Sequence, residues 1–113
     1  MDPLRLVDEL SRAIELQDAD RVAEVLHPDV ELHLYSGQGV ITGREQARAW
    51  YRESFTSRIL FEGHAEPDAE SDGSIVMRGN VRWYDESGLR DRPGRWRVTF
   101  RDGLIASITA EET

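Results

Sequence analysis

The hydrophobic pattern of this chain changes its period once, near residue 58. Before that point apolar residues recur at spacings of three and four, as on one face of a helix, and after it they alternate with polar residues, as in a half-buried strand. Helices in the first half followed by strands in the second are typical of an α+β domain, in which helices pack on one face of an antiparallel sheet. No linker or repeat interrupts residues 1–113, so the sequence predicts a single domain.

Three helices are expected. Asp2 and Pro3 form a cap and first-turn pair for a helix that runs to about Leu16, and a short second helix begins after the polar break QDAD and ends just past His27, before Pro28. Thr42 and Glu45 have the spacing of a capping box and predict the start of a third helix there. The apolar face of that helix comprises Ala47, Trp50, Tyr51, Ser54 and Phe55.

The predicted strands begin between the second and third helices. One strand is expected over about residues 29–35, and a brief one follows over 40–42. The segments SRILFEGHAE, GSIVMRGNVRWYD, GRWRVTF and LIASITA then alternate in succession, separated by turns rich in glycine, proline and acidic residues. Consecutive strands joined by short turns predict an antiparallel meander, and therefore a curved, mostly antiparallel sheet with the helices packed on one face.

Composition excludes several classes of chemistry and of partner. The chain has no cysteine, which removes disulfides, thiolate nucleophiles and thiolate metal sites, and all fourteen basic residues are arginine, which removes lysine Schiff-base chemistry. The net charge of -8 would repel a phosphate backbone unless the arginines formed a strong patch, so no nucleic-acid partner is expected. With no long apolar run and no signal-like start, we expect a cytoplasmic protein without a membrane partner.

Alternation in the stretch HPDVELHLYSG decides which side chains face inward. Val30, Leu32 and Leu34 share one face of the predicted strand, whereas Glu31, His33 and Tyr35 share the other. We expect the apolar face to look toward the helices and to line any cavity, and the polar face to be solvated, to face a dimer partner or to lie at the rim of a pocket. The same parity places these polar residues of the later strands on the outer face: Glu62, His64, Arg78, Asn80, Arg82, Arg95 and Arg97.

Two groups of polar residues resemble metal ligands in part, and neither predicts a metal site. His27 and His33 are roughly 20 Å apart in an extended strand, and Glu31 with His33 supplies two ligands where zinc needs three or four. His27 is instead expected to contact the last carbonyls of the preceding helix. The stretch from Asp68 to Gly73 reproduces the first half of a calcium loop, but the closing glutamate is replaced by Gly79, so a solvated turn is expected.

Three segments carry a family resemblance: QDADRVAEVLHPDVELH, GVITGREQARAWY and VTFRDGLIASITA. In order and spacing they resemble the SnoaL-like branch of the nuclear transport factor 2-like (NTF2-like) superfamily over nearly the whole chain. The resemblance implies a cone-shaped, cystatin-like α+β roll that encloses an apolar pocket, often as a homodimer through the outer sheet face. Members range from ketosteroid isomerases, polyketide cyclases, dehydratases and epoxide hydrolases to non-catalytic binding modules, so the fold alone does not decide the function.

The catalytic residues of ketosteroid isomerases do not carry over. By resemblance their base falls on Leu34, their tyrosine near Leu10 and their acid on Trp96, and all three residues are apolar. A hydrolase or dehydratase would need polar groups converging inside the cone, and the row Arg78, Asn80 and Arg82 would supply them only if the faces of the sheet were inverted, against the hydrophobic effect. No catalytic residue is assigned.

Tyr51 is the best remaining candidate for an inward proton donor. The alternative interpretation is a core tyrosine whose hydroxyl lies at the edge. Either way it joins the aromatic residues of the predicted interior.

The sequence thus predicts an apolar interior and leaves two hypotheses for it. One is a pocket for a small hydrophobic molecule, in an isomerase-, cyclase- or lyase-like protein with no cofactor; the other is a non-catalytic homodimeric interaction module whose core is filled by tryptophan. Val98 is expected in the same interior. The predicted pocket residues are Leu10, Ile14, Leu34, Trp50, Tyr51, Phe61, Met77, Trp83, Trp96 and Phe100.

Overall fold

A computed structural model describes residues 2–34, 38–63 and 67–111. The helices are α1 (Pro3–Glu15), α2 (Ala19–Glu24) and α3 (Arg44–Thr56). The strands are β1 (Leu26–His33), β2 (Val40–Thr42), β3 (Leu60–Gly63), β4 (Asp68–Ala69), β5 (Ile75–Asp85), β6 (Gly88–Arg101) and β7 (Leu104–Glu111).

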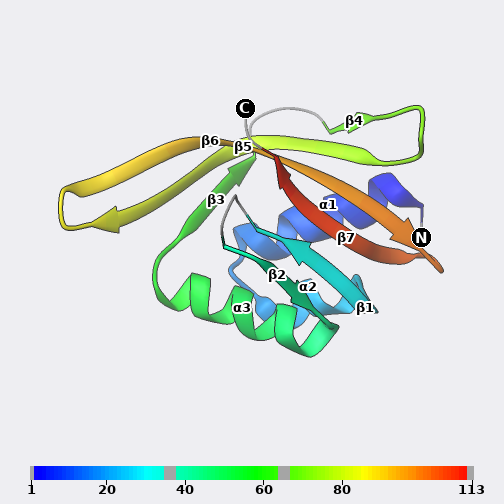
Figure 1. Cartoon of the computed structure of the whole chain (residues 1–113), viewed down its shortest axis with the longest axis horizontal. Coiled ribbons are helices and arrows are strands. Elements are labelled where there is room, and N and C mark those ends of the chain that lie inside the picture. Colours follow the sequence, from blue (N-terminus) through cyan, green and yellow to red (C-terminus); the bar gives the residue numbers. More distant parts are fainter. Residues whose placement is uncertain (1, 35–37, 64–66, 112–113) are drawn as a thin grey trace.

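The strands form one curved sheet in the order β2-β1-β7-β6-β5-β3, with β4 paired to β5. The pairs are antiparallel except β1 with β7, which run parallel. The helices lie on the same side of the sheet, and the long β5–β6 hairpin extends away from them (Figure 1). The predicted α+β fold, with helices on one face of a mostly antiparallel sheet, is confirmed.

The first helix begins and ends as the sequence predicts. The side chain of Asp2 accepts a hydrogen bond from the backbone N–H of Arg5 at 3.1 Å, and Pro3 occupies the first helical position. Leu16 closes the helix as its C-cap. An N-cap carboxylate satisfies an otherwise unpaired N–H of the first turn, and this explains why the sequence signal is reliable here.

The predicted boundaries of the other two helices are wrong, in both cases because sheet pairing takes the residues. α2 ends at Glu24, and β1 begins at Leu26, whose neighbour Val25 accepts a hydrogen bond from Ile105 N–H at 2.9 Å. Thr42 belongs to β2 and lies opposite Glu31. Gly43 is therefore the N-cap of α3, and no side chain caps that helix.

The core lies between the apolar face of α1 and the inner face of the sheet. Leu6, Val7 and Leu10 of α1 are buried, and they belong to one cluster with the buried Val30 and Leu32 of β1. Glu31, between those two strand residues, is exposed, so the predicted alternation of β1 is confirmed. The cluster continues across Ile75, Val98, Ile105 and Ile108 of the neighbouring strands.

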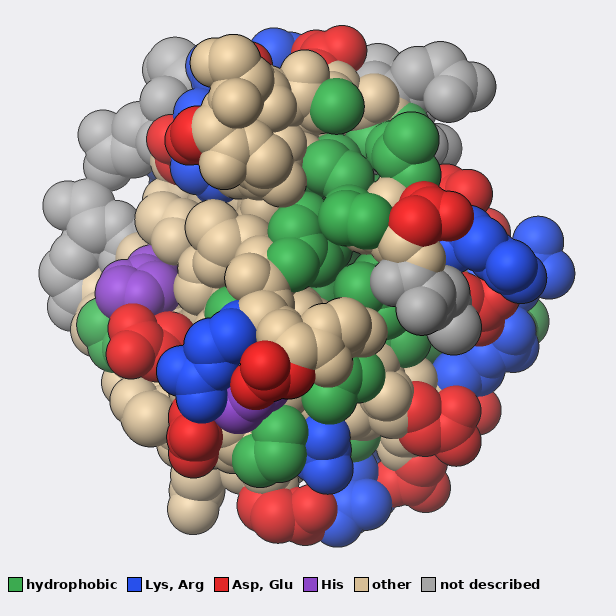
Figure 2. Space-filling model, turned by 90° about the vertical axis from the view of Figure 1, so that its right-hand side faces the viewer, with side chains coloured by type: hydrophobic (Ala, Val, Ile, Leu, Met, Phe, Trp, Pro, Cys, Tyr) green, Lys and Arg blue, Asp and Glu red, His purple; other side chains and the backbone are tan. Residues whose placement is uncertain are grey.

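The outer face of the sheet is polar and rich in ion pairs. His33 pairs with Glu31 at 2.9 Å, and Arg97 pairs with Glu111 at 3.4 Å. Acidic and basic side chains also lie next to one another on the face shown in Figure 2. Tyr35 and His64, both expected on the outer face, lie outside the described residues, as does the side chain of Glu62.

None of the helices in the described part of the chain is both long and apolar enough to cross a bilayer.

Candidate functional site

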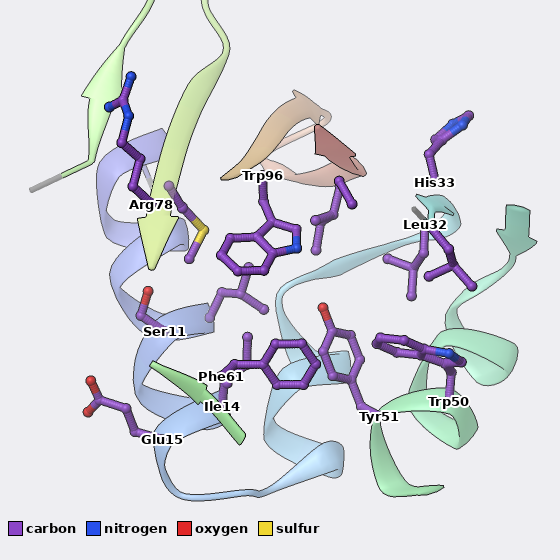
Figure 3. Close-up of a pocket in the computed structure, with 15 residues that line it drawn as sticks. Ser11, Ile14, Glu15, Leu32, His33, Trp50, Tyr51, Phe61, Arg78 and Trp96 are labelled. Carbon is purple, nitrogen blue, oxygen red and sulfur yellow. The ribbon is translucent and has the colours of Figure 1, made fainter. Parts of the chain in front are cut away.

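A cavity lies between α1, α3 and the inner face of the sheet, with about 90 Å³ open to the centres of water-sized molecules (Figure 3). Its wall is formed by side chains of α1, β1, α3, β3, β5, β6 and β7. Eight of the residues predicted from the sequence line it: Leu10, Ile14, Leu34, Trp50, Tyr51, Phe61, Met77 and Trp96. The remaining lining residues are Ser11, Glu15, Leu32, His33, Arg78, Ile108 and Ala110.

The structure does not bring the other two predicted residues to this cavity. Trp83 lies opposite Arg90 in the β5–β6 hairpin, beyond the part of the sheet that the helices cover. Phe100 packs against the core near the β6–β7 turn, where it pairs with Ile105. Alternation predicted the face of each residue, but it carries no information on which helix covers that face.

Aromatic rings form one wall of the cavity. Phe61 of β3 contacts three of them, with ring centroids 6.3 Å from Trp50, 6.4 Å from Tyr51 and 6.3 Å from Trp96. Trp50 and Tyr51 meet edge to face at 5.0 Å and 82°. Edge-to-face pairs stabilise one another beyond their area of contact, so the rings hold each other in fixed orientations.

Gly94 determines where the Trp96 indole lies. The two residues are two apart on β6 and face inward together, and a Cβ atom built on Gly94 would come within 2.1 Å of the benzo edge of the indole. Only glycine leaves room for the ring to lie over the backbone at this point. The sequence reasoning missed this role of Gly94 in positioning the Trp96 ring.

Replacing Gly94 by alanine is expected to displace the Trp96 indole and to change the shape of the cavity. Because the added methyl group would overlap ring atoms, the indole must move, at a cost of about 1–3 kcal/mol in the free energy of unfolding. Urea denaturation and the near-ultraviolet circular dichroism of the tryptophans measure both effects. Gly73→Ala, in a surface turn, is the control for the near-ultraviolet signal alone, because the φ of +91° at Gly73 strains any side chain there and lowers stability by itself. An unchanged near-ultraviolet signal in Gly94→Ala would contradict this packing.

Tyr51 is the most buried polar side chain of the wall. It is 5% exposed, and burial raises the pKa of its hydroxyl well above the ordinary value of about 10. In Figure 3 the hydroxyl points into the cavity rather than toward solvent. The alternative of a hydroxyl at the edge of the core is therefore not what the structure shows.

The raised pKa predicts a pH dependence above pH 10. The unfolded chain releases the Tyr51 proton near pH 10, whereas the folded chain keeps it, so the stability of the folded state falls as the pH rises beyond that value. At pH 11 we expect wild type to lose about 1.4 kcal/mol relative to the Tyr51→Phe variant, and no relative loss between pH 7 and 9. Urea denaturation of both proteins at each pH measures this difference, and a constant difference across the range would contradict the burial of an unionised phenol.

The charged residues at the rim turn their ends away from the cavity. Figure 3 shows the imidazole of His33 and the guanidinium of Arg78 pointing outward, and they pair with Glu31 and Asp68, respectively. The carboxylate of Glu15, also in the lining, points away from the aromatic rings in Figure 3, so none of the described lining carboxylates or imidazoles is placed in the interior as a general base. The positions that resemble the isomerase residues, Leu10, Leu34 and Trp96, all line the cavity with apolar atoms or rings.

His27 is not at a helix end and does not contact helix carbonyls, contrary to the prediction. It lies in β1, where its Nδ1 accepts a hydrogen bond from the backbone N–H of Asp29 at 3.0 Å. Its Nε2 lies 3.2 Å from a carboxylate oxygen of Asp102 in the β6–β7 turn. Since Nδ1 accepts, the proton is on Nε2, and the side chain ties β1 to that turn.

The polar residues considered as metal ligands or as a catalytic row have other partners. Among the described residues, no cluster of three or more His, Asp or Glu side chains is arranged to hold a metal ion. Asp72 accepts hydrogen bonds from the backbone and hydroxyl of Ser74, which lower the pKa of its carboxyl and close the turn. Asn80 and Arg82 bond to Asp91 on the outer face, away from the cavity.

Sequence reasoning placed Leu32 of β1 on the face that lines the cavity, as the structure does, but it missed two lining residues on β7, Ile108 and Ala110. Leu32, Ile108 and Ala110 complete the wall, and Ala110 lies directly opposite Trp96 in the sheet. The alternation of apolar and polar residues in β1 and in the LIASITA segment was the signal from which these lining residues could have been predicted. What was missing was the parallel pairing of β1 with β7, which brings Leu32 and Ile108 side by side.

The chain resembles one protein family and a set of solved structures. The profile of the SnoaL-like domain family matches residues 7–108. Among curated proteins, none matches the chain.

The solved structures share the fold at low sequence identity. A cystatin-fold protein from Novosphingobium aromaticivorans is 19% identical with a TM-score of 0.83, and 99% of each chain is covered. A protein proposed to be a polyketide cyclase, from Sinorhizobium meliloti, is 18% identical with a TM-score of 0.78, covering 95% of this chain and 94% of that one. The epoxide hydrolase/cyclase-like enzyme SalBIII, which has a role in pyran ring formation in the polyether salinomycin, is 20% identical with a TM-score of 0.81, covering 94% and 86%.

Proposed function

Because this chain belongs to the SnoaL-like domain family, we propose that it binds a small hydrophobic ring molecule in the cavity between α1, α3 and the sheet. The observation that carries the proposal is an interior space walled by aliphatic side chains and aromatic rings, with the charged groups of the rim turned outward. Ligand pockets in proteins have this composition, with apolar walls and few polar groups.

The size of the cavity favours a compact ligand. An apolar cavity of about 150 Å³ binds benzene in another protein. With about 90 Å³ open to the centres of water-sized molecules, this cavity is smaller than that, but it is open on one side, so it suits one ring, or two fused rings of which one extends into the opening, rather than a steroid. A ligand of that size is expected to bind with a Kd of roughly 10 µM to 1 mM, which corresponds to about 4 to 7 kcal/mol.

A cyclase-, isomerase- or lyase-like reaction on the bound ring is the catalytic form of the proposal. It is supported by the family and by the cyclase names of two structural neighbours. The ketosteroid-isomerase mechanism is not part of it, because Leu10, Leu34 and Trp96 occupy the positions of its catalytic groups. The catalytic residues of any such reaction are unassigned.

The test is native mass spectrometry of protein purified from its own host, combined with a titration of the same protein with indane. The proposal expects a retained mass of one or two rings, or saturable binding of indane that shifts tryptophan fluorescence. Bare protein that also fails to bind indane would overturn it.

A non-catalytic homodimeric module is the second candidate, and the outer sheet face favours it. On that face Arg95 Nε and Glu111 Oε1 form an ion pair at 3.4 Å, but neither of these two buried atoms has a hydrogen bond of good geometry among the described residues. A partner surface would supply such bonds. Sedimentation equilibrium tests this candidate: it expects a dimer that Thr109→Arg, in the same face, converts to a monomer, whereas a wild-type monomer at all concentrations would contradict it.

A further inference from the structure

Among the uncharged side chains that line the cavity, those of Ser11, Trp50, Tyr51 and Trp96 carry donors with no hydrogen bond in the described part of the chain. Two of these donors, the hydroxyl of Tyr51 and the indole N–H of Trp96, lie in the aromatic wall, where their rings contact Trp50, Phe55 and Phe61. A buried donor that loses its hydrogen bond to water costs about 1–3 kcal/mol, so most buried donors in proteins are paired. Neither of these two donor atoms is fully cut off from the cavity space, so the acceptor that pairs with them is water or a ligand that enters the cavity.

The two donors lie toward one another. In Figure 3 the Tyr51 hydroxyl points toward Trp96, and the ring nitrogen of Trp96 lies on the side of the indole nearer to Tyr51. The ring nitrogen of Trp50, in contrast, lies at the far end of its indole from Tyr51. The two donors therefore form a polar spot in the aromatic part of the wall.

Packing fixes both donors before any ligand arrives. The benzo edge of Trp96 lies over Gly94, and its ring meets Phe61 at 71°, while Tyr51 is held edge to face by Trp50. Donors that are already oriented cost little to order on binding, so a ligand oxygen placed between them gains most of the energy of the bonds.

The surroundings favour an acceptor over a donor on the ligand. Two charged side chains of the rim have partners outside the cavity, His33 with Glu31 and Arg78 with Asp68. The acceptor oxygens of Ser11 and Glu15 also belong to the lining, and in Figure 3 they lie on the α1 side, away from the Tyr51 hydroxyl. A ligand N–H placed beside Tyr51 and Trp96 would thus meet no acceptor other than the Tyr51 oxygen, whereas a carbonyl or ether oxygen there would meet two donors.

We propose that the Tyr51 hydroxyl and the Trp96 indole N–H together bind one acceptor oxygen, and that the ligand is a one- or two-ring apolar molecule bearing a carbonyl or ether oxygen. This inference rests on the proposed binding function of the cavity and assigns its specificity to two residues. Tyr51 and Trp96 are then the residues that select the ligand class, while the aliphatic wall selects its size.

The experiment compares 1-indanone with indane, which share one ring skeleton and differ by the carbonyl oxygen. Dissociation constants are measured by ligand-detected NMR for wild type, Tyr51→Phe and Trp96→Phe. We expect wild type to bind 1-indanone at least about 10-fold more tightly than indane, and each variant to reduce that ratio by about 3- to 10-fold. The ratio is the readout, because a changed cavity shape alters the binding of both probes.

Matched substitutions outside the cavity serve as controls. Tyr84→Phe and Trp83→Phe remove the same atoms from the β5–β6 hairpin and are expected to leave the ratio unchanged. Equal binding of both probes to wild type, or a ratio that Tyr51→Phe and Trp96→Phe leave unchanged, would overturn the inference while the proposed binding function stands. Failure of both probes to bind the folded protein would overturn the two together.

Discussion

Replacing Ala110 by leucine is expected to lower the affinity for indane at least 100-fold and to leave the fold intact. Ala110 lines the cavity from β7 and lies opposite Trp96, so the added carbon atoms enter the space that a ring would occupy. Because they fill empty volume, the free energy of unfolding should stay within about 1 kcal/mol of the wild-type value. Ligand-detected NMR gives the affinity, and urea denaturation gives the stability.

The control for this substitution is Ala49→Leu on α3. Ala49 is exposed and next in sequence to Trp50, so it receives the same added atoms without reaching the interior. Its affinity for indane should equal that of wild type. An Ala110→Leu variant that binds indane as tightly as wild type would place the binding site somewhere else.

Replacing Leu26 by alanine is expected to lower the free energy of unfolding by about 2–5 kcal/mol. Leu26 is 0% exposed at the start of β1, where it pairs with Ile105 of β7, and its loss leaves a cavity in the core cluster. Leu89→Ala, at an exposed position near the end of the β5–β6 hairpin, should cost less than about 0.5 kcal/mol. Urea denaturation of both variants tests the comparison, and equal costs would contradict the core described above.

The sequence predicted the fold because its local and long-range signals agree. The change of period near residue 58 separates α1, α2 and α3 from β3 to β7, and alternation in β1 assigned Val30 and Leu32 to the inside. Where a local sequence signal and sheet pairing favour different structures for the same residue, the prediction from the local signal was wrong. Thr42 has the spacing of a helix cap, but pairing with Glu31 in the sheet holds it in β2.

The candidate site was predicted in composition but not in detail. The alternation of side chains along a strand predicts which face of the sheet each residue lies on, and it identified Met77 and Trp96 as inward residues. In the structure these two residues lie opposite one another. It cannot show how far the helices reach, and for this reason Trp83 was expected in a cavity that it does not line. The roles of Gly94 and of the Tyr51 hydroxyl depend on atoms of other elements, so only the folded arrangement reveals them.

The central claim is that the space beside Tyr51 and Trp96 receives a ring-shaped ligand. Intermolecular nuclear Overhauser effects between 1-indanone and the isotopically labelled protein test it most directly. The account predicts cross-peaks from the ring protons of the probe to the side chains of Ile14, Met77 and Ile108, which come from three different elements around the cavity. Cross-peaks only to the β5–β6 hairpin or to the outer face of the sheet would contradict it.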